Sequence, residues 1–327
     1  MKKKHAFLGA AKFFVLLILI IVMLYSGLQI LESSVLYSAG ESAETGTKKT
    51  ITYNGKEYFP RQDITVMMVL GIDQFGPVTP SHYYRNEGSA DSVMLLVFDE
   101  TNHNCTVLYM NRDTMLHMDV LGVRGEYAGT AYGQLALAHT YGSGMEDSCL
   151  NVKNTLQNFI HGMSIDYYVA MNMDAIPILN DAVGGVTVNV TDDFSQVNPS
   201  ITMGELTLKG NQVLDFVRTR KDVGDQKNVT RMERQKEYVD GFLRKLQNKE
   251  QEDIEFALKL YEAVAPYIVT DCSAETLSAM LDRYEEFAIA EVVMPEGENM
   301  IVDGHYAFYV DEKNLEELTI RLFYAPK

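Results

Sequence analysis

Short β-forming runs alternate with helical patterns from residue 64 to the end of the chain, and this alternation constrains the fold more than any other feature. The β-rich runs cover 64–72, 92–98, 105–110, 167–171 and 186–190. Helical periodicity covers 146–159, 174–183, 228–246, 254–267 and 274–287. Strands interspersed with helices bury their apolar faces in layers, which predicts a mixed α/β (α+β) fold with a central mixed β-sheet flanked by helices. No repeat or compositional break divides 64–324, so residues 63–327 are expected to form one domain.

The N-terminus predicts a membrane anchor. Residues 13–31 form an uncharged, mostly apolar run of 19 residues, long enough to span a bilayer as a helix. Four lysines and no acidic residue precede it, so the positive-inside rule places residues 1–12 in the cytoplasm and the main domain on the extracellular face of the cell membrane. A cleaved signal peptide is the alternative, although its apolar core is usually shorter. The polar stretch 32–62 is expected to be a juxtamembrane linker.

The charge balance argues against a nucleic-acid partner. The chain has 45 acidic and 28 basic residues, a net charge of −17. Four of the lysines precede the anchor, so the expected extracellular part is more acidic still. Nucleic-acid binding requires many cations that neutralise phosphates. The three cysteines are too few and too scattered for a disulfide framework or a zinc site, and we expect packed thiols with at most one bridge.

Against this acidic background, basic side chains concentrate in 217–235. In an extended segment Arg218 and Arg220 point to the same face, and in a helix Arg231, Arg234 and Gln235 share a face. Guanidiniums aimed at one place repel one another unless an anion lies between them, and phosphate oxygens suit their forked donors. The alternative is a solvated basic helix face that makes surface ion pairs with nearby acidic residues.

A second polar group is expected at one end of the sheet. The strands at 91–98 and 105–112 are joined by a short polar turn, so antiparallel pairing of residue 98 with residue 105 places Asp91 opposite Arg112. If the strand before Asp73 pairs antiparallel with the strand at 91–98, the second in chain order, Asp73 reaches the same end. Two carboxylates near an anion-binding arginine suit Mg²⁺ bridging protein and phosphate. The alternative is that both aspartates are turn formers or caps and that Asp113 merely neutralises the arginine.

Six motifs then occur in one order along the chain: Leu70–Asp73, Ala90–Ser92, Met110–Thr114, Gly184–Val186, Val217–Arg220 and Arg231–Gln235. This series, spanning roughly 64–250 behind an N-terminal anchor, resembles the LytR–CpsA–Psr family of cell-envelope attachment proteins. The resemblance implies a magnesium-dependent phosphotransferase. Its implied substrates are a polyprenyl-pyrophosphate-linked glycopolymer, such as teichoic acid or capsule, and peptidoglycan as the acceptor.

The resemblance also implies site residues. Magnesium is expected on the positions Asp73 and Asp91, and pyrophosphate on Arg112, Arg218, Arg220, Arg231 and Gln235, with Arg234 added from the shared helix face. The residues expected to act in catalysis are Arg112, Arg218, Arg220 and Asp225. The base for the attacking hydroxyl is open among Asp73, Asp113 and Asp225.

The chain departs from the family pattern at two places. Ser89 stands where the family has an arginine two residues before Asp91, and Arg85 in the same loop is the candidate substitute for pyrophosphate binding. No aspartate immediately precedes the second arginine pair, where Asp225 is the nearest. Two other functions therefore stay open: a non-catalytic polyprenyl-phosphate-binding regulator or scaffold of envelope assembly, and an extracellular adhesion or structural protein with surface arginines only.

Overall fold

The computed structural model describes residues 50–326 except 84, 123, 220, 221, 225–227, 254, 285 and 286. The predicted cytoplasmic segment 1–12 and transmembrane helix 13–31 lie outside these residues, as do Arg220 and Asp225. In the part of the chain that is described, no helix combines the length and the apolar character needed to cross a membrane.

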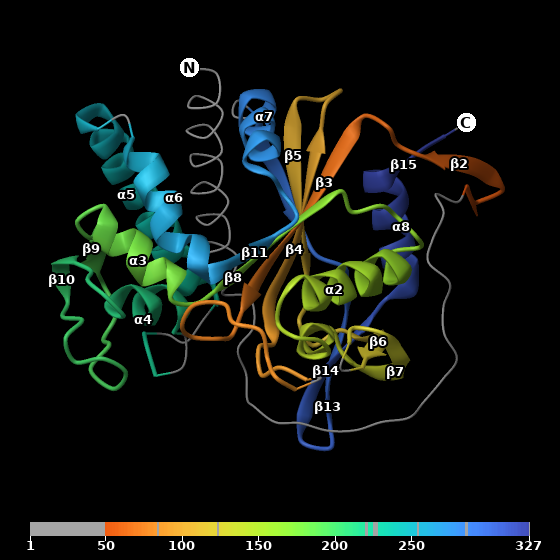
Figure 1. The fold of residues 1–327 in the computed structure, drawn as a ribbon, viewed down its shortest axis with the longest axis horizontal. Helices are drawn as coiled ribbons and strands as arrows, with labels where there is room; N and C mark the ends of the chain where they lie inside the picture. Colours follow the sequence, from red (N-terminus) through yellow and green to blue (C-terminus); the bar gives the residue numbers. More distant parts are fainter. Residues whose placement is uncertain are drawn as a thin grey trace.

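A mixed central sheet runs through the middle of the molecule (Figure 1). Within the described residues it has six strands, in the spatial order β11, β8, β3, β4, β5, β12. Their bounds are Ile64–Ile72 (β3), Ala90–Asp99 (β4), Asn104–Met110 (β5), Tyr167–Asn172 (β8), Ile268–Thr270 (β11) and Ala288–Val293 (β12). The β3–β8 and β5–β12 pairs are parallel, and the β3–β4, β4–β5 and β8–β11 pairs are antiparallel. The predicted mixed sheet is confirmed.

The register of β4 and β5 is the one that the short turn predicts. Phe98 pairs with Cys105, and Val93 pairs with Met110 at the far end of the ladder. β3 pairs antiparallel with β4, so its C-terminal end meets the N-terminal end of β4. One end of the sheet, at the bottom of Figure 1, therefore carries three polar residues: Asp73 after β3, Asp91 near the start of β4 and Arg112 after β5.

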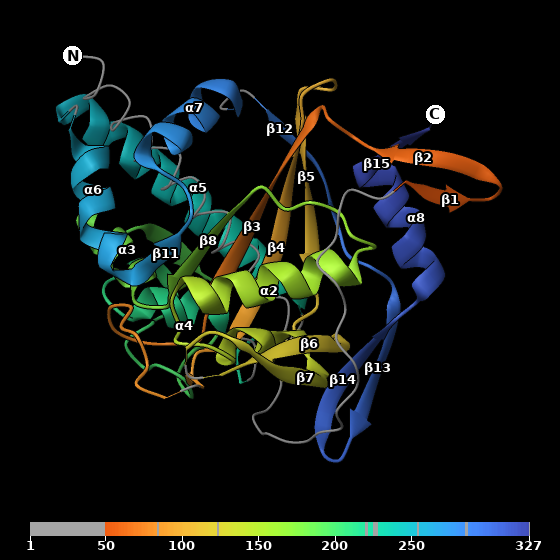
Figure 2. The same cartoon turned by 45° about the vertical axis from the view of Figure 1, so that its right-hand side comes forward.

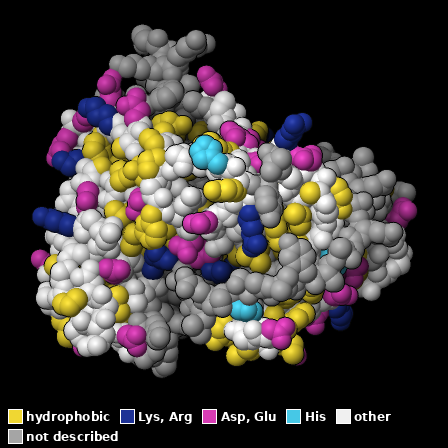
Figure 3. All heavy atoms as spheres, turned by 60° about the horizontal axis from the view of Figure 1, so that its bottom comes forward, with side chains coloured by type: hydrophobic (Ala, Val, Ile, Leu, Met, Phe, Trp, Pro, Cys, Tyr) yellow, Lys and Arg dark blue, Asp and Glu magenta, His cyan; other side chains and the backbone are white. Residues whose placement is uncertain are grey.

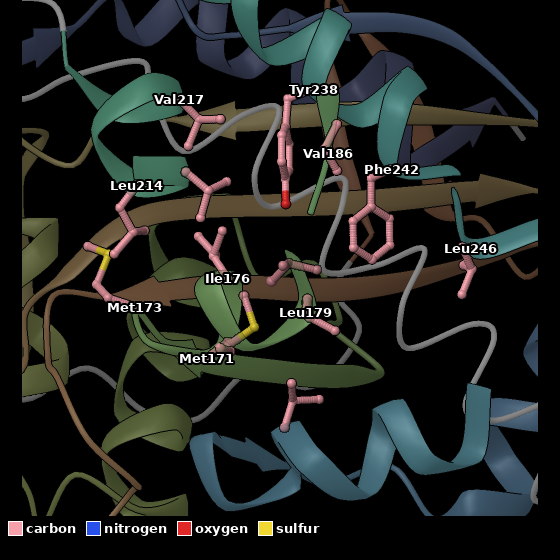
Figure 4. Close-up of a cluster of buried hydrophobic side chains, with 14 of the residues drawn as sticks. Met171, Met173, Ile176, Leu179, Val186, Leu214, Val217, Tyr238, Phe242 and Leu246 are labelled. Carbon is pink, nitrogen blue, oxygen red and sulfur yellow. The ribbon is translucent and has the colours of Figure 1, made fainter. Parts of the chain in front are cut away.

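Helices cover one face of the sheet over a large apolar cluster. The elements on this side are α3 (Ala175–Ala182), β9 (Thr187–Val190), β10 (Gly204–Thr207), α4 (Gln212–Arg218), α5 (Asn228–Glu252), α6 (Phe256–Val264), the 3₁₀ turn η2 (Ala265–Tyr267) and α7 (Ala274–Tyr284). Figure 4 shows Tyr238, Phe242 and Leu246 of α5 directed toward Ile176 and Leu179 of α3. Their spacing of four residues along α5 places them on one helix face, which the core buries.

A second cluster fills the opposite face. It lies beneath β6 (Met115–Leu121), β7 (Tyr127–Gln134), the 3₁₀ helix η1 (Leu135–Thr140), α2 (Glu146–Phe159), α8 (Glu312–Phe323) and β15 (Tyr324–Pro326). Figure 2 shows the β6–β7 hairpin beside a second hairpin, β13 (Gly297–Val302) and β14 (His305–Val310). The helix predicted over 146–159 coincides with α2.

Regular structure is present in part of the predicted linker. Two strands, β1 (Ile51–Tyr53) and β2 (Lys56–Pro60), lie inside the stretch 32–62 that was expected to be a linker. β2 pairs with β15 at the C-terminal end of the chain, where Tyr324 lies opposite Pro60. A pairing between segments so distant in sequence leaves no local signal, which is why the linker prediction fails for 51–60.

Candidate active site at the end of the central sheet

A β-bulge positions Asp91. Gly71 of β3 pairs with Ser92 and Ile72 pairs with Ala90, so Asp91 is an extra residue on β4. Ala90 and Val93 both pack into the cluster beneath α2, although regular alternation would put residues three apart on opposite faces. The bulge therefore breaks the regular alternation of β4 at Asp91, and the contacts with Ser89 and Arg112 fix the position of its carboxylate.

Arg112 and Ser89 hold the Asp91 carboxylate. A guanidinium nitrogen of Arg112 forms an ion pair with Oδ1 of Asp91, whose side chain is fully buried. The Ser89 hydroxyl donates a hydrogen bond of 2.9 Å to the same oxygen. The predicted meeting of Asp91 with Arg112 is therefore present in the structure. Ser89, which departs from the family pattern, orients this carboxylate.

Arg218 brings the second aspartate into the group. It is the last residue of α4, and its Nη2 lies 3.9 Å from Oδ1 of Asp73. The expectation that Arg218 lies in an extended segment with Arg220 is wrong for Arg218, because the buried side chains of Val213, Phe216 and Val217 hold its segment as a helix against the core. The chain becomes extended only at Thr219, where φ is −72° and ψ is 130°.

Asp113 forms a buried carboxyl group behind the site. Its Oδ1 lies 3.7 Å from Nε of Arg112 and accepts a hydrogen bond of 2.9 Å from the Gln134 side-chain amide. Burial raises the pKa of Asp113 to about 6, with the Asp91 carboxylate adding to the shift and Arg112 opposing it. Arg112 therefore does not simply neutralise Asp113, because desolvation outweighs the attraction.

This shift predicts a pH dependence of stability. The pKa of Asp113 rises from 3.8 to about 6 on folding, so the native state holds this proton more tightly than the unfolded chain. The resulting stability is complete below about pH 4 and is lost as the pH rises through 6. We expect the free energy of unfolding of the wild type to fall by on the order of 3 kcal/mol over this window relative to Asp113→Asn. Thermal melts in EDTA would measure it, and parallel curves for both proteins would contradict it.

Arg234 is buried and pairs with Asp192. Only 6% of its side chain is exposed, and its Nη1 lies 2.8 Å from Oδ2 of Asp192. Its guanidinium also donates to the Thr219 carbonyl oxygen and lies 5.0 Å from the centre of the Phe194 ring. Arg234 therefore ties α5 to the core, and its pyrophosphate contact stays a prediction. The sequence carried a partial signal, because Arg234 stands four residues before the buried Tyr238 on the same helix face.

The structure describes only some of the remaining predicted site residues. Arg231 and Gln235 lie on α5, as predicted, but their side chains are outside the described residues, together with all of Arg220 and Asp225. Arg85 is exposed, and its guanidinium carbon lies 5.2 Å from the centre of the Tyr141 ring.

A buried clamp holds the loop that leads to Ser89, and the sequence did not reveal it. The Asn86 amide donates to the His139 carbonyl oxygen at 2.7 Å, and its own oxygen accepts from the Gly88 N–H at 2.8 Å. Nδ1 of His139 lies 2.7 Å from the Gly88 carbonyl oxygen, and burial lowers the pKa of His139 to about 4. A neutral ring therefore donates from Nδ1. The next residue, Ser89, accepts the Asp73 backbone N–H at 2.9 Å, which links the clamp to both aspartates.

The group combines opposite charges within a small region. Figure 3, which looks at the lower end of the molecule, shows acidic and basic side chains side by side near the middle of this face, with hydrophobic side chains around them. Each of the two carboxylates lies beside a guanidinium, Asp91 beside Arg112 and Asp73 beside Arg218.

Similarity to known proteins covers most of the chain. The model of the LytR_cpsA_psr family matches residues 32–323. The polyisoprenyl-teichoic acid–peptidoglycan teichoic acid transferase TagU of Enterococcus faecalis is 26% identical over 84% of this chain and 82% of its own length. TagU of Bacillus subtilis is 23% identical over 89% of this chain and 86% of its own. The crystal structure of B. subtilis TagV shares the fold, with a TM-score of 0.55 and 22% identity over 80% of this chain and 96% of that one.

Proposed function

Because the chain belongs to the LytR–CpsA–Psr family, we propose that it transfers a glycopolymer from a polyprenyl-pyrophosphate carrier to peptidoglycan. The names of the TagU relatives state a transfer of teichoic acid to peptidoglycan. The observation that carries the proposal is the convergence of Asp73, Asp91, Arg112 and Arg218 at one end of the sheet. These side chains come from three strand ends and a helix end, and such a group suits a phosphate ligand with its counterion.

In this proposal Arg112 and Arg218 bind the pyrophosphate through their forked donors. Arg220, Arg231 and Gln235 supply further contacts, as the family resemblance implies. The guanidiniums stabilise the negative charge that develops on the phosphoryl oxygens, and positioning supplies much of the remaining acceleration.

The proposed chemistry is a displacement at phosphorus. An acceptor sugar hydroxyl forms a bond to the phosphorus that carries the glycopolymer, and the bond from that phosphorus to the bridging oxygen breaks. Polyprenyl phosphate leaves with the electron pair, and the hydroxyl proton passes to a base. The candidates for this base are the three that the sequence analysis left open, Asp73, Asp113 and Asp225.

Magnesium is part of the proposal. Among the described residues no group of three or more His, Cys, Asp or Glu side chains could hold a metal. Magnesium nevertheless needs only one or two carboxylates when phosphate oxygens and waters complete its shell, so Asp73 and Asp91 fit it. Bound there, it would neutralise charge on the pyrophosphate.

We also propose that residues 13–31 anchor the chain in the cell membrane as a single-pass helix with the N-terminus in the cytoplasm. The support is the apolar run itself and the lysines before it. This placement leaves the catalytic domain outside the cell, where a lipid-linked polymer and peptidoglycan meet.

The test uses the full chain in lipid vesicles with a polyprenyl-pyrophosphate-linked teichoic acid precursor and isolated peptidoglycan. We expect polymer to become covalently attached and polyprenyl phosphate to be released in equal amounts, both dependent on magnesium and both abolished by EDTA. Binding of the carrier without release of polyprenyl phosphate would contradict the proposal. It would favour the non-catalytic regulator or scaffold instead.

A further inference from the structure

Two hairpins are attached to the segment that carries Arg112. The Phe308 backbone N–H of β14 donates to the Asp113 carbonyl oxygen at 2.8 Å, and Thr114 forms a parallel bridge with Phe308. β6 begins at Met115, directly after this segment. The Gln134 amide at the end of β7 donates both to Asp113 and, at 2.7 Å, to the Tyr306 carbonyl oxygen of β14. The two hairpins are thus held to each other and to the candidate site.

The outer side of these hairpins exposes aromatic rings. Tyr132 is 37% exposed and Tyr309 is 36% exposed. Partial burial raises the pKa of Tyr132, and the nearby Tyr309 hydroxyl adds to this shift. His117 is the cross-strand partner of Tyr132, and the two ring centres lie 4.9 Å apart. Tyr127, 49% exposed, lies further along β7 and hydrogen-bonds to the Thr130 hydroxyl at 2.9 Å.

The aromatic surface leads away from the site along one strand face. Tyr132 and Gln134 are two residues apart on β7, so they face the same side about 7 Å apart. The opposite face of the hairpin is filled by the core residues Leu116, Met118 and Ala131. The surface therefore begins beside the amide that holds Asp113 and continues outward past His117 and Tyr132.

The chemistry of this surface suits a sugar chain. Tyrosine presents a flat apolar ring with a hydroxyl at its tip, and a pyranose presents apolar C–H faces bordered by hydroxyls. Rings separated along a strand can therefore stack on successive sugars and hydrogen-bond to their hydroxyls. Tyr132, Tyr309, Tyr127 and Thr130 offer hydroxyls and apolar surface and no cationic side chain, so the surface favours an uncharged glycan backbone over a polyanionic donor polymer.

We propose that the surface formed by His117, Tyr127, Tyr132 and Tyr309 binds the glycan strand of the peptidoglycan acceptor and presents its hydroxyl to the site beside Arg112. This inference rests on the proposed function, and it assigns the acceptor to a surface separate from the carboxylates and arginines that bind the donor. The continuity of hydrogen bonds from Asp113 through Gln134 to both hairpins is the observation that carries it.

The experiment measures acceptor and donor kinetics separately for the full chain in vesicles. Tyr132→Ala and Tyr309→Ala should each raise the KM for peptidoglycan at least about fivefold, because each removes a stacking ring. The KM for the lipid-linked donor and the kcat should stay within about twofold. Tyr132→Phe keeps the ring and should retain most of the affinity. The matched control is Phe59→Ala on β2, a ring of similar exposure at 40% in a different sheet, which should leave both KM values unchanged.

A second arm needs no donor. The full chain is sedimented with peptidoglycan stripped of attached polymer, and Tyr132→Ala and Tyr309→Ala should bind at least about fivefold more weakly than wild type. If wild type transfers polymer but both alanine variants keep the wild-type KM and binding, the surface assignment is wrong and the proposed function stands. If wild type transfers nothing, the proposed function fails, and the sedimentation arm alone still supports or overturns the glycan surface.

Discussion

Asp91→Ala should lower magnesium-dependent polymer transfer by roughly a thousandfold or more. The change removes the proposed metal ligand and also frees Arg112 from its present partner, so both the charge and the geometry of the site are lost. Loss of a single preorganised electrostatic contact in an active site costs roughly 10²–10³ in rate, and here two are lost together. The measurement is release of polyprenyl phosphate over a range of magnesium concentrations, with far-ultraviolet circular dichroism to confirm folding.

The same strand supplies a matched control. Asp99, at the opposite end of β4, is also largely buried and forms an ion pair of 2.8 Å with Arg61. Asp99→Ala should therefore lower the melting temperature, because it breaks a partly buried ion pair. It should leave the transfer rate near that of the wild type. Equal loss of activity in both variants would show that Asp91 matters only for folding. Near-normal turnover of Asp91→Ala at limiting magnesium would remove it from the metal site.

Arg234→Ala should destabilise the domain by about 3–5 kcal/mol, because it leaves the Asp192 carboxylate without its buried partner. The change also removes the donor to the Thr219 carbonyl oxygen, which links the end of α4 to α5. Arg218→Ala should change stability by less than about 1 kcal/mol, because its contact with Asp73 is long and partly exposed. Its affinity for a polyprenyl pyrophosphate should nevertheless fall at least about tenfold.

Chemical denaturation and vesicle binding of the two variants separate these roles. We expect Arg234→Ala to lose stability and to keep its affinity in the folded fraction. We expect Arg218→Ala to keep its stability and to lose affinity. Unchanged stability in Arg234→Ala combined with a tenfold loss of affinity would place Arg234 back among the pyrophosphate ligands. Unchanged affinity in Arg218→Ala would contradict the phosphate site.

Much of the sheet could be predicted because its signals are local. The apolar run of β3, the periodicity of α2 and the short turn between β4 and β5 each lie within a few residues, and the turn length sets the register. The convergence of Asp91 with Arg112 followed from that register. The strands β1 and β2 were missed because their partner, β15, lies at the other end of the chain.

By itself, the sequence determined the mixed sheet, the order of the motifs and the end of the sheet at which Asp73, Asp91 and Arg112 lie, since periodicity and turn length are properties of neighbouring residues. Only the tertiary structure decided which side chains face the site. The bulge at Asp91 breaks the alternation of β4, and Asp192 holds Arg234 in the core although Arg234 has the same chemistry as Arg218. A guanidinium takes whichever carboxylate or phosphate its surroundings place beside it, because charge and burial act through space and not along the chain.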